Sequence, residues 1–151
     1  MIDQLKESLI SAHRTGDKRS AGEVYRMLGE TCRTLNHFQA AFDHFEQALS
    51  IFRELGDRTE EAATLRLIGI AYFETGQHAA ALDIFQQVLL IQRAVHNKPG
   101  EATALFNVAI AYTELSQPAE ALRHNLDALE IFTDLGDRLG ESRALANVGE
   151  T

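Results

Sequence analysis

The chain has 151 residues, a length typical of one domain or of one short array of repeats. Hydrophobic residues make up 45% and charged residues 24%, which is globular composition and excludes a disordered tail. The net charge of −8 argues against nucleic acid or an anionic membrane as a partner, because phosphate binding needs a basic surface. No apolar run reaches the roughly 18 residues of a membrane span, and the first residues do not resemble a signal peptide. A single cysteine excludes a disulfide framework and fits a reducing compartment, so we expect a cytoplasmic protein.

A period of 40 residues runs through the whole chain. The tripeptide Gly16-Asp17-Lys18 returns in similar form at 56–58, 96–98 and 136–138. Residues 56–95 and 96–135 are identical at 13 of 40 aligned positions, with no insertion or deletion. A fixed period of this length predicts a solenoid, in which each repeat packs on its neighbours. We expect one array with a partial repeat over 1–15, full repeats over 16–55, 56–95 and 96–135, and a truncated repeat over 136–151.

The apolar spacing within each repeat is helical. Leu65 and Tyr72, seven residues apart, share one helical face with the apolar positions between them. Asn36 and Gly76 occupy equivalent positions and suit the left-handed conformation that ends a helix, whereas Ser116 in the third repeat suits it less well. No strand pattern occurs in the sequence. We expect helices over 2–14, 18–34, 38–54, 58–74, 78–94, 99–114, 118–134 and 138–150.

Each repeat carries the same pattern of large and small residues. The copies read Tyr25-x-x-Leu28-Gly29-x-x-Cys32 and Ala41-x-x-x-Phe45, then Leu65-x-x-Ile68-Gly69-x-x-Tyr72 and Ala81-x-x-x-Phe85, then Leu105-x-x-Val108-Ala109-x-x-Tyr112 and Ala121-x-x-x-Asn125. This pattern resembles the tetratricopeptide repeat over essentially the whole chain. The resemblance implies an all-α fold, an α-solenoid in which antiparallel helix pairs form a right-handed superhelix. HEAT repeats have a similar length, but the Gly-x-x-Tyr and Ala-x-x-x-Phe spacing favours tetratricopeptide repeats.

The period is 40 residues rather than the more usual 34 or so. In this it is similar to the arrays of kinesin light chains, spindle-orientation adaptors and bacterial signalling regulators. The Leu-Gly-Asp-Arg linkers also resemble those of arrays fused to bacterial output domains. An alternative function is therefore a regulatory or dimerisation module of a larger bacterial signalling protein with a separate output domain.

The two terminal helices are expected to lack their usual partners. Ile2, Leu5 and Leu9 form an apolar stripe at one end, and Leu145 and Val148 form one at the other. Solenoids normally end in repeats with a polar outer face, so we expect a segment of a longer array. The rival interpretation is a short natural chain whose ends associate. Both allow a homodimer through the unpaired terminal helices.

The first helix of each repeat has a second face, opposite the one that pairs within the repeat. In tetratricopeptide arrays this face lines a concave groove, so the resemblance implies a non-enzymatic scaffold that binds a peptide or protein segment. Leu67, Phe73 and Phe106 are not needed for pairing within a repeat, and the arginines nearby suit acidic groups of a partner. Asn107 and Asn147 occupy a column in which Asn holds the peptide backbone of groove-binding relatives. The candidate partner-binding residues are Arg26, Glu30, Arg33, Arg66, Ile70, Phe73, Phe106, Asn107, Ile110, Arg143 and Asn147.

Nothing in the sequence predicts catalysis. It contains no Gly-rich phosphate loop, His-Glu-x-x-His motif or nucleophile elbow. The 6 histidines fall mostly near turns or on outer helix faces, so we expect exposed histidines and no metal site. Cys32 stands in a core column and is expected to be buried, whereas Glu60 and Glu61 are expected to be solvated at a helix start. We therefore predict no enzymatic activity and no cofactor.

Overall fold

The structure is a computed structural model that describes residues 1–149. These residues form eight helices: α1 (Ile2–Thr15), α2 (Lys18–Thr34), α3 (Phe38–Leu55), α4 (Arg58–Glu74), α5 (His78–Ala94), α6 (Lys98–Glu114), α7 (Pro118–Leu135) and α8 (Arg138–Gly149). Each bound lies within one residue of the sequence prediction, and no strand occurs in the described part of the chain. The predicted end of the last helix, at residue 150, lies outside the described residues.

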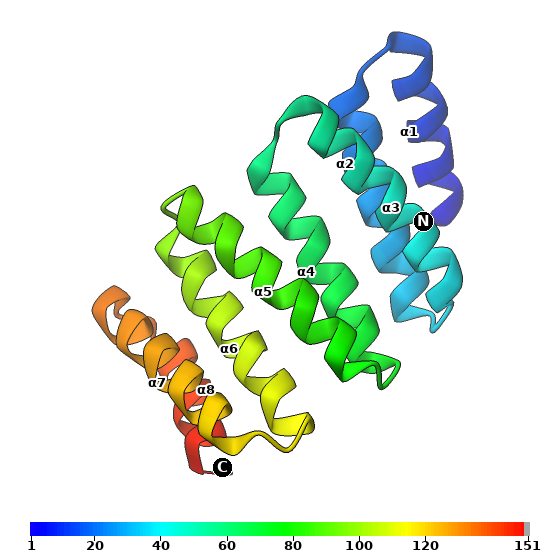
Figure 1. The fold of residues 1–151 in the computed structure, drawn as a ribbon. Helices are drawn as coiled ribbons and strands as arrows, with labels where there is room; N and C mark the ends of the chain where they lie inside the picture. The colour runs from blue at the N-terminus through cyan, green and yellow to red at the C-terminus, as the bar shows by residue number, and fades with distance from the viewer. Residues whose placement is uncertain (150–151) are drawn as a thin grey trace. The chain divides into compact units, whose positions relative to one another are not determined.

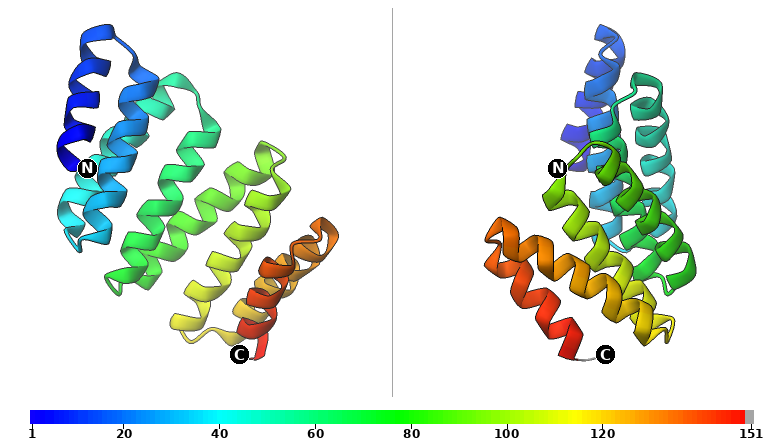
Figure 2. Two further views of the ribbon diagram at one scale, coloured as in Figure 1. Left: turned by 180° about the vertical axis from the view of Figure 1, so that it is seen from behind. Right: turned by 60° about the vertical axis from the view of Figure 1, so that its left-hand side comes forward.

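The chain divides into two compact units, one over residues 1–71 and one from residue 72 onward, with the boundary inside α4. In the N-terminal unit α1 packs on α2 and α2 packs on α3. In the C-terminal unit α5 packs on α6, α6 on α7, and α7 on α8. Within each unit these successive helices run antiparallel (Figures 1 and 2).

Seven residues with positive φ, spaced 20 residues apart, end the successive helices. They have φ between 55° and 75° and are Gly16, Asn36, Gly56, Gly76, His96, Ser116 and Gly136. The following residue donates its backbone N–H to a carbonyl five positions earlier, as from His37 to Cys32 at 2.9 Å. Asp57 then accepts a hydrogen bond at Oδ1 from the backbone N–H of Glu60 at 3.1 Å, which caps α4. The prediction of Gly and Asn as helix-ending residues is confirmed.

A close approach of α2 to α3 forms the core of the N-terminal unit. Phe45 and Phe52 on α3 are both 0% exposed. Phe45 lies against Gly29, where an added Cβ atom would come within 2.5 Å of the aromatic ring. Phe52 lies against Gly22, where the added Cβ atom would be 3.0 Å from the ring. Glycine is required at these two positions because the helices leave no room for a side chain.

The prediction that α1 lacks a packing partner for its apolar stripe is wrong. Leu5 is only 9% exposed and forms a cluster with Val24 and Leu28 of α2, and Ile2 and Leu9 pack against that cluster. The stripe is covered because it faces the following helix. At the other end of the described chain Leu145 is 55% exposed, whereas Leu105, one period earlier, is 1% exposed.

Buried carboxylates join the second helix of one repeat to the first helix of the next. Glu61 is 4% exposed rather than solvated as predicted, because Arg53 Nε on α3 donates to its Oε1 at 2.9 Å. In the C-terminal unit Glu101 receives hydrogen bonds from Arg93 Nε and Lys98 Nζ, both at 2.8 Å. Burial raises the pKa of the Glu101 carboxyl, but the hydrogen bonds and charges of Lys98 and Arg93 outweigh it. The net pKa therefore lies below its ordinary value of 4.5.

Candidate functional site

The predicted partner-binding residues fall in both units, and each unit is described by itself. The N-terminal unit contains Arg26, Glu30 and Arg33 on α2 and Arg66 and Ile70 on α4. The C-terminal unit contains Phe73 at the end of α4, Phe106, Asn107 and Ile110 on α6, and Arg143 and Asn147 on α8. Glu30 and Arg143 are exposed and the others are half-buried, so all of them reach the surface. Leu67, which the helical geometry also placed there, is only 3% exposed and is part of the core.

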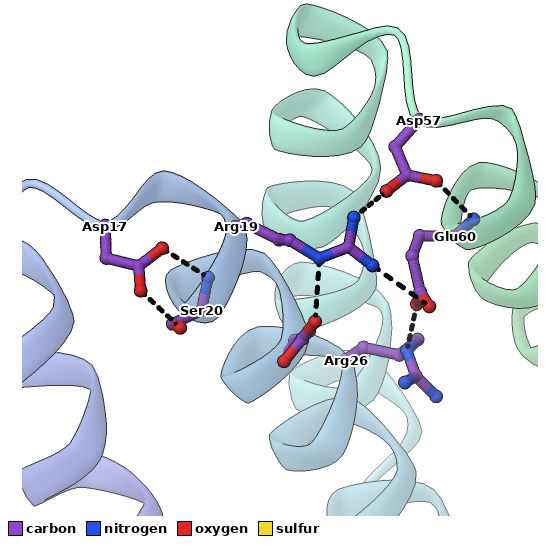
Figure 3. Close-up of polar contacts among 7 residues, drawn as sticks. Asp17, Arg19, Ser20, Arg26, Asp57 and Glu60 are labelled. Carbon is purple, nitrogen blue, oxygen red and sulfur yellow. Dashed lines mark hydrogen bonds and ion pairs between the residues drawn. The ribbon is translucent and has the colours of Figure 1, made fainter.

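An ion-pair network already occupies some of the predicted charges in the N-terminal unit. Arg19 on α2 pairs with Asp57 and, through Nη2, approaches Glu60 to 3.9 Å (Figure 3). Arg26 Nε lies 3.3 Å from Glu60 Oε2 (Figure 3). The charge of Asp57 raises the pKa of the Arg19 guanidinium above its ordinary value. Arg26, expected to meet an acidic group of a partner, is therefore paired with a carboxylate of this chain.

Two half-buried residues on α4 complete the predicted surface of the N-terminal unit. Arg66 forms no ion pair or hydrogen bond with any residue in 1–149, and Ile70 lies one helical turn further along the same face. Arg66 therefore keeps a cationic group beside an apolar side chain on this part of the surface.

In the C-terminal unit, α6 and α8 lie side by side and form what we call the α6–α8 surface, defined by Phe106, Asn107, Ile110, Arg143 and Asn147. The guanidinium carbon of Arg143 lies 5.8 Å from the centroid of the Phe106 ring, a cation–π arrangement. A small cavity of about 90 Å³ opens beside this pair, lined also by Thr103 and Phe132. The α6–α8 surface thus brings an aromatic ring, an aliphatic side chain, a guanidinium and two amides together.

The two asparagines of this surface differ in their surroundings. Asn147 Nδ2 donates to Asn125 Oδ1 on α7 at 3.2 Å. Asn107 forms no hydrogen bond through its side chain with any residue in 1–149. Asn125 is 0% exposed, and the sequence gives one signal for it, since it stands in the motif column that holds Phe45 and Phe85 in the other repeats.

One histidine is buried, against the prediction that the histidines are exposed. His124 is 9% exposed, and its ring lies 5.3 Å from the ring of Tyr112. Its Nδ1 lies 2.8 Å from the backbone oxygen of Glu120, so the imidazole is fixed by its own helix. Cys32 is buried as predicted. In the described part of the chain no three His, Cys, Asp or Glu side chains converge in a way that would hold a metal ion.

The larger cavities lie away from the predicted residues. One of about 390 Å³ is lined by Arg93, Glu101 and Ile131, and one of about 400 Å³ by His13, Tyr25 and Ile51. The two occupy equivalent places two periods apart, beside the end of a second helix in each unit. Neither contains a predicted partner-binding residue, and both arise from the repeat geometry. No helix among residues 1–149 is both long and apolar enough to cross a bilayer.

Comparison with known proteins identifies the repeat. A family model for the tetratricopeptide repeat matches residues 1–54 and 60–134, which together make up most of the chain. No curated protein sequence matches the chain.

Three solved structures show the same fold. The apo form of RapI is 19% identical with a TM-score of 0.90, over 97% of this chain and 41% of RapI. A putative kinesin light chain with nearly identical repeats, from Podosopora anserina, is 19% identical with a TM-score of 0.75, over 99% and 78%. The N-terminal domain of stress-induced protein-1 from C. elegans is 14% identical with a TM-score of 0.70, over 86% and 96%. At these identities the likeness concerns the fold, an all-α solenoid, and the chain spans about two fifths of the length of RapI.

Proposed function

Because the chain belongs to the tetratricopeptide repeat family, we propose that it is a non-enzymatic interaction module that binds a peptide or protein segment on the exposed face of its first helices. The observation that supports this most directly is the α6–α8 surface. There an aromatic ring and an aliphatic side chain adjoin a guanidinium and an amide that has no hydrogen bond within residues 1–149. Interfaces concentrate their binding energy in such partly buried aromatic and arginine residues.

The chemistry of the α6–α8 surface suggests the class of partner. Phe106 and Ile110 favour an apolar side chain, and Arg143 favours a carboxylate beside it. Asn107 can donate and accept at once, which matches the backbone of an extended peptide. We therefore expect an extended segment that carries an apolar and an acidic residue close together.

The N-terminal unit contributes through α4 rather than through α2 in this proposal. Arg66 has no partner carboxylate among residues 1–149, whereas the carboxylate of Glu60 already neutralises Arg26. A second acidic side chain of the partner would gain more from Arg66 than from Arg26, because it would not have to displace an existing ion pair. Replacement of Arg66 by alanine should therefore weaken binding more than replacement of Arg26.

The experiment is a selection of random peptides from a display library against the immobilised chain, followed by fluorescence anisotropy with the most enriched peptide. Phe106→Ala and Arg143→Ala should each weaken binding by about tenfold or more, as expected for central interface residues. Arg123→Ala is the matched control, since it removes an exposed arginine from α7. Failure to enrich any peptide, or equal affinity for all variants, would contradict the proposal.

A second candidate function is self-association, as in a dimerisation module of a larger signalling protein. The exposure of Leu145, at 55% against 1% for Leu105, favours it because a leucine in this column is otherwise covered by a following helix. Sedimentation equilibrium of the chain should then show a concentration-dependent dimer that Leu145→Glu abolishes. Leu139→Glu is the control, because Leu139 is also exposed on α8, at 70%. A monomer at all concentrations would contradict self-association.

A further inference from the structure

One motif column changes its chemistry in the third repeat. In the first repeat it holds Phe45, 0% exposed, whose ring lies so close to Gly29 that a Cβ atom there would come within 2.5 Å. In the third repeat the same column holds Asn125, also 0% exposed, and the column of Gly29 holds Ala109. A smaller side chain on one helix is thus matched by a larger one on the other. The exchange keeps the core filled while it places an amide where the first repeat has a ring.

The buried amide is only half satisfied. Asn125 Oδ1 accepts a hydrogen bond from Asn147 Nδ2 at 3.2 Å. Asn125 Nδ2 is buried and finds no acceptor among the described residues. A buried donor without a partner destabilises a fold, and an apolar residue of the same size would avoid this loss. Core packing alone therefore does not account for asparagine at this position.

We infer that Asn125 is a positioning residue that holds the amide of Asn147 in a fixed orientation on the α6–α8 surface. The inference rests on the proposed function, in which this surface binds a peptide segment. Asn125 acts from α7, behind the surface, and its Oδ1 sets the direction of the Asn147 NH₂ group. Asn107, in the same column one repeat earlier, has no such support within residues 1–149. Asn147 is thus oriented before a peptide arrives, whereas Asn107 becomes ordered on binding.

Asn125→Leu separates positioning from a merely structural role. Leucine has nearly the same size, removes the acceptor for Asn147 and also removes the unpaired buried donor. If Asn125 serves only to stabilise the packing of α7 on α8, the variant loses thermal stability. If it positions Asn147, the variant is as stable as the wild type or more stable, but the Asn147 amide loses its fixed orientation. The double variant Ala109→Gly/Asn125→Phe rebuilds the pairing of the first repeat and serves the same purpose if leucine disturbs folding.

The primary measurement is ¹⁵N relaxation of the side-chain NH₂ groups of the full chain, which needs no ligand. We expect the Asn147 NH₂ group to be rigid and that of Asn107 to be mobile in the wild type. In Asn125→Leu the Asn147 NH₂ group should become as mobile as that of Asn107. An Asn147 group that stays rigid in the variant, or that is already mobile in the wild type, would overturn the inference.

The second measurement is the affinity of the most enriched library peptide for the same variants. Ordering one additional side chain on binding should weaken the affinity by about two- to tenfold in Asn125→Leu. An unchanged affinity would refute the role of Asn125 in binding. If no peptide is enriched at all, the proposed function fails, while the relaxation data still decide whether Asn125 orients Asn147.

Discussion

Gly29→Ala tests whether the close approach of α2 to α3 is as tight as the structure shows. The added Cβ atom would lie 2.5 Å from Cδ1 and Cε1 of Phe45 and 3.0 Å from Cγ. Carbon atoms in contact normally lie about 3.5–4.0 Å apart, so a shift of about 1 Å is needed. Because Phe45 is 0% exposed, its ring has no open space to move into. Overpacking of this kind costs about 1–3 kcal/mol, and alanine returns about 1 kcal/mol through its higher helix propensity.

We expect a net loss of about 2 kcal/mol in the free energy of unfolding, taking the upper end of the overpacking range. For a chain of this size that corresponds to a decrease in Tm of about 4–8 °C. Urea unfolding and thermal unfolding, both followed by far-ultraviolet circular dichroism, would measure it. Gly22→Ala should cost less, since its Cβ atom would be 3.0 Å from the nearest ring atoms of Phe52.

A double variant supplies the control for this prediction. Phe45→Leu removes the ring that the new methyl group would meet, so the loss in Gly29→Ala/Phe45→Leu should be smaller than the sum of the two single losses. A coupling of about 1 kcal/mol or more is expected for residues in such direct contact. If Gly29→Ala is as stable as the wild type, or if the two losses add, the packing described for this pair is wrong.

Three further predictions concern the turns and the ion pairs. Ser116→Gly should stabilise the chain by about 1 kcal/mol, seen as a higher urea midpoint, because Ser116 holds a φ of 56°; an unchanged midpoint would contradict it. Asn97→Ala should cost about 1 kcal/mol in the same assay, because Asn97 Oδ1 caps α6 by accepting a backbone N–H at 3.1 Å; a neutral result would show that this cap contributes nothing. The folded-state pKa of Glu101 is lowered by Lys98 and Arg93, so its contribution is present above the ordinary value of 4.5 and is lost as the pH falls below it. Glu101→Gln should therefore destabilise the chain at neutral pH and reduce the loss of stability on acidification; parallel pH profiles for the two proteins would refute this.

The helix boundaries are predictable from sequence because local chemistry decides them. Asn36 and Gly76 tolerate the left-handed conformation, and the aspartate after Gly56 caps the next helix, so each end is marked within a few residues. The 40-residue period then transfers each assignment from one repeat to the next. It assigns the same turn to His96 and Ser116, whose side chains favour it less.

Side-chain pairing on the candidate surface is not predictable in the same way. A helical wheel gives the direction in which Arg26 points, but it does not give the 34-residue step across the chain to Glu60. The hydrogen bond between Asn125 and Asn147 likewise joins two different helices. Leu67 illustrates a related limit, since it faces away from its own repeat partner and is nevertheless buried. The partner-binding residues remain predictions that the peptide experiment tests.

The left-handed residues that end the helices recur every 20 residues, and this spacing restricts how the chain can change in length. One residue inserted within a helix would rotate all later side chains of that helix by about 100°, and an insertion early in α3 would turn Phe45 away from Gly29. An insertion beside an exposed turn residue such as Gly56 would leave the preceding helix face unaltered, and the next helix would start afresh from its own cap. Growth or loss of a whole period preserves every such face at once. The chain is therefore built to vary in steps of one repeat, or at its turns, and to resist any change between them.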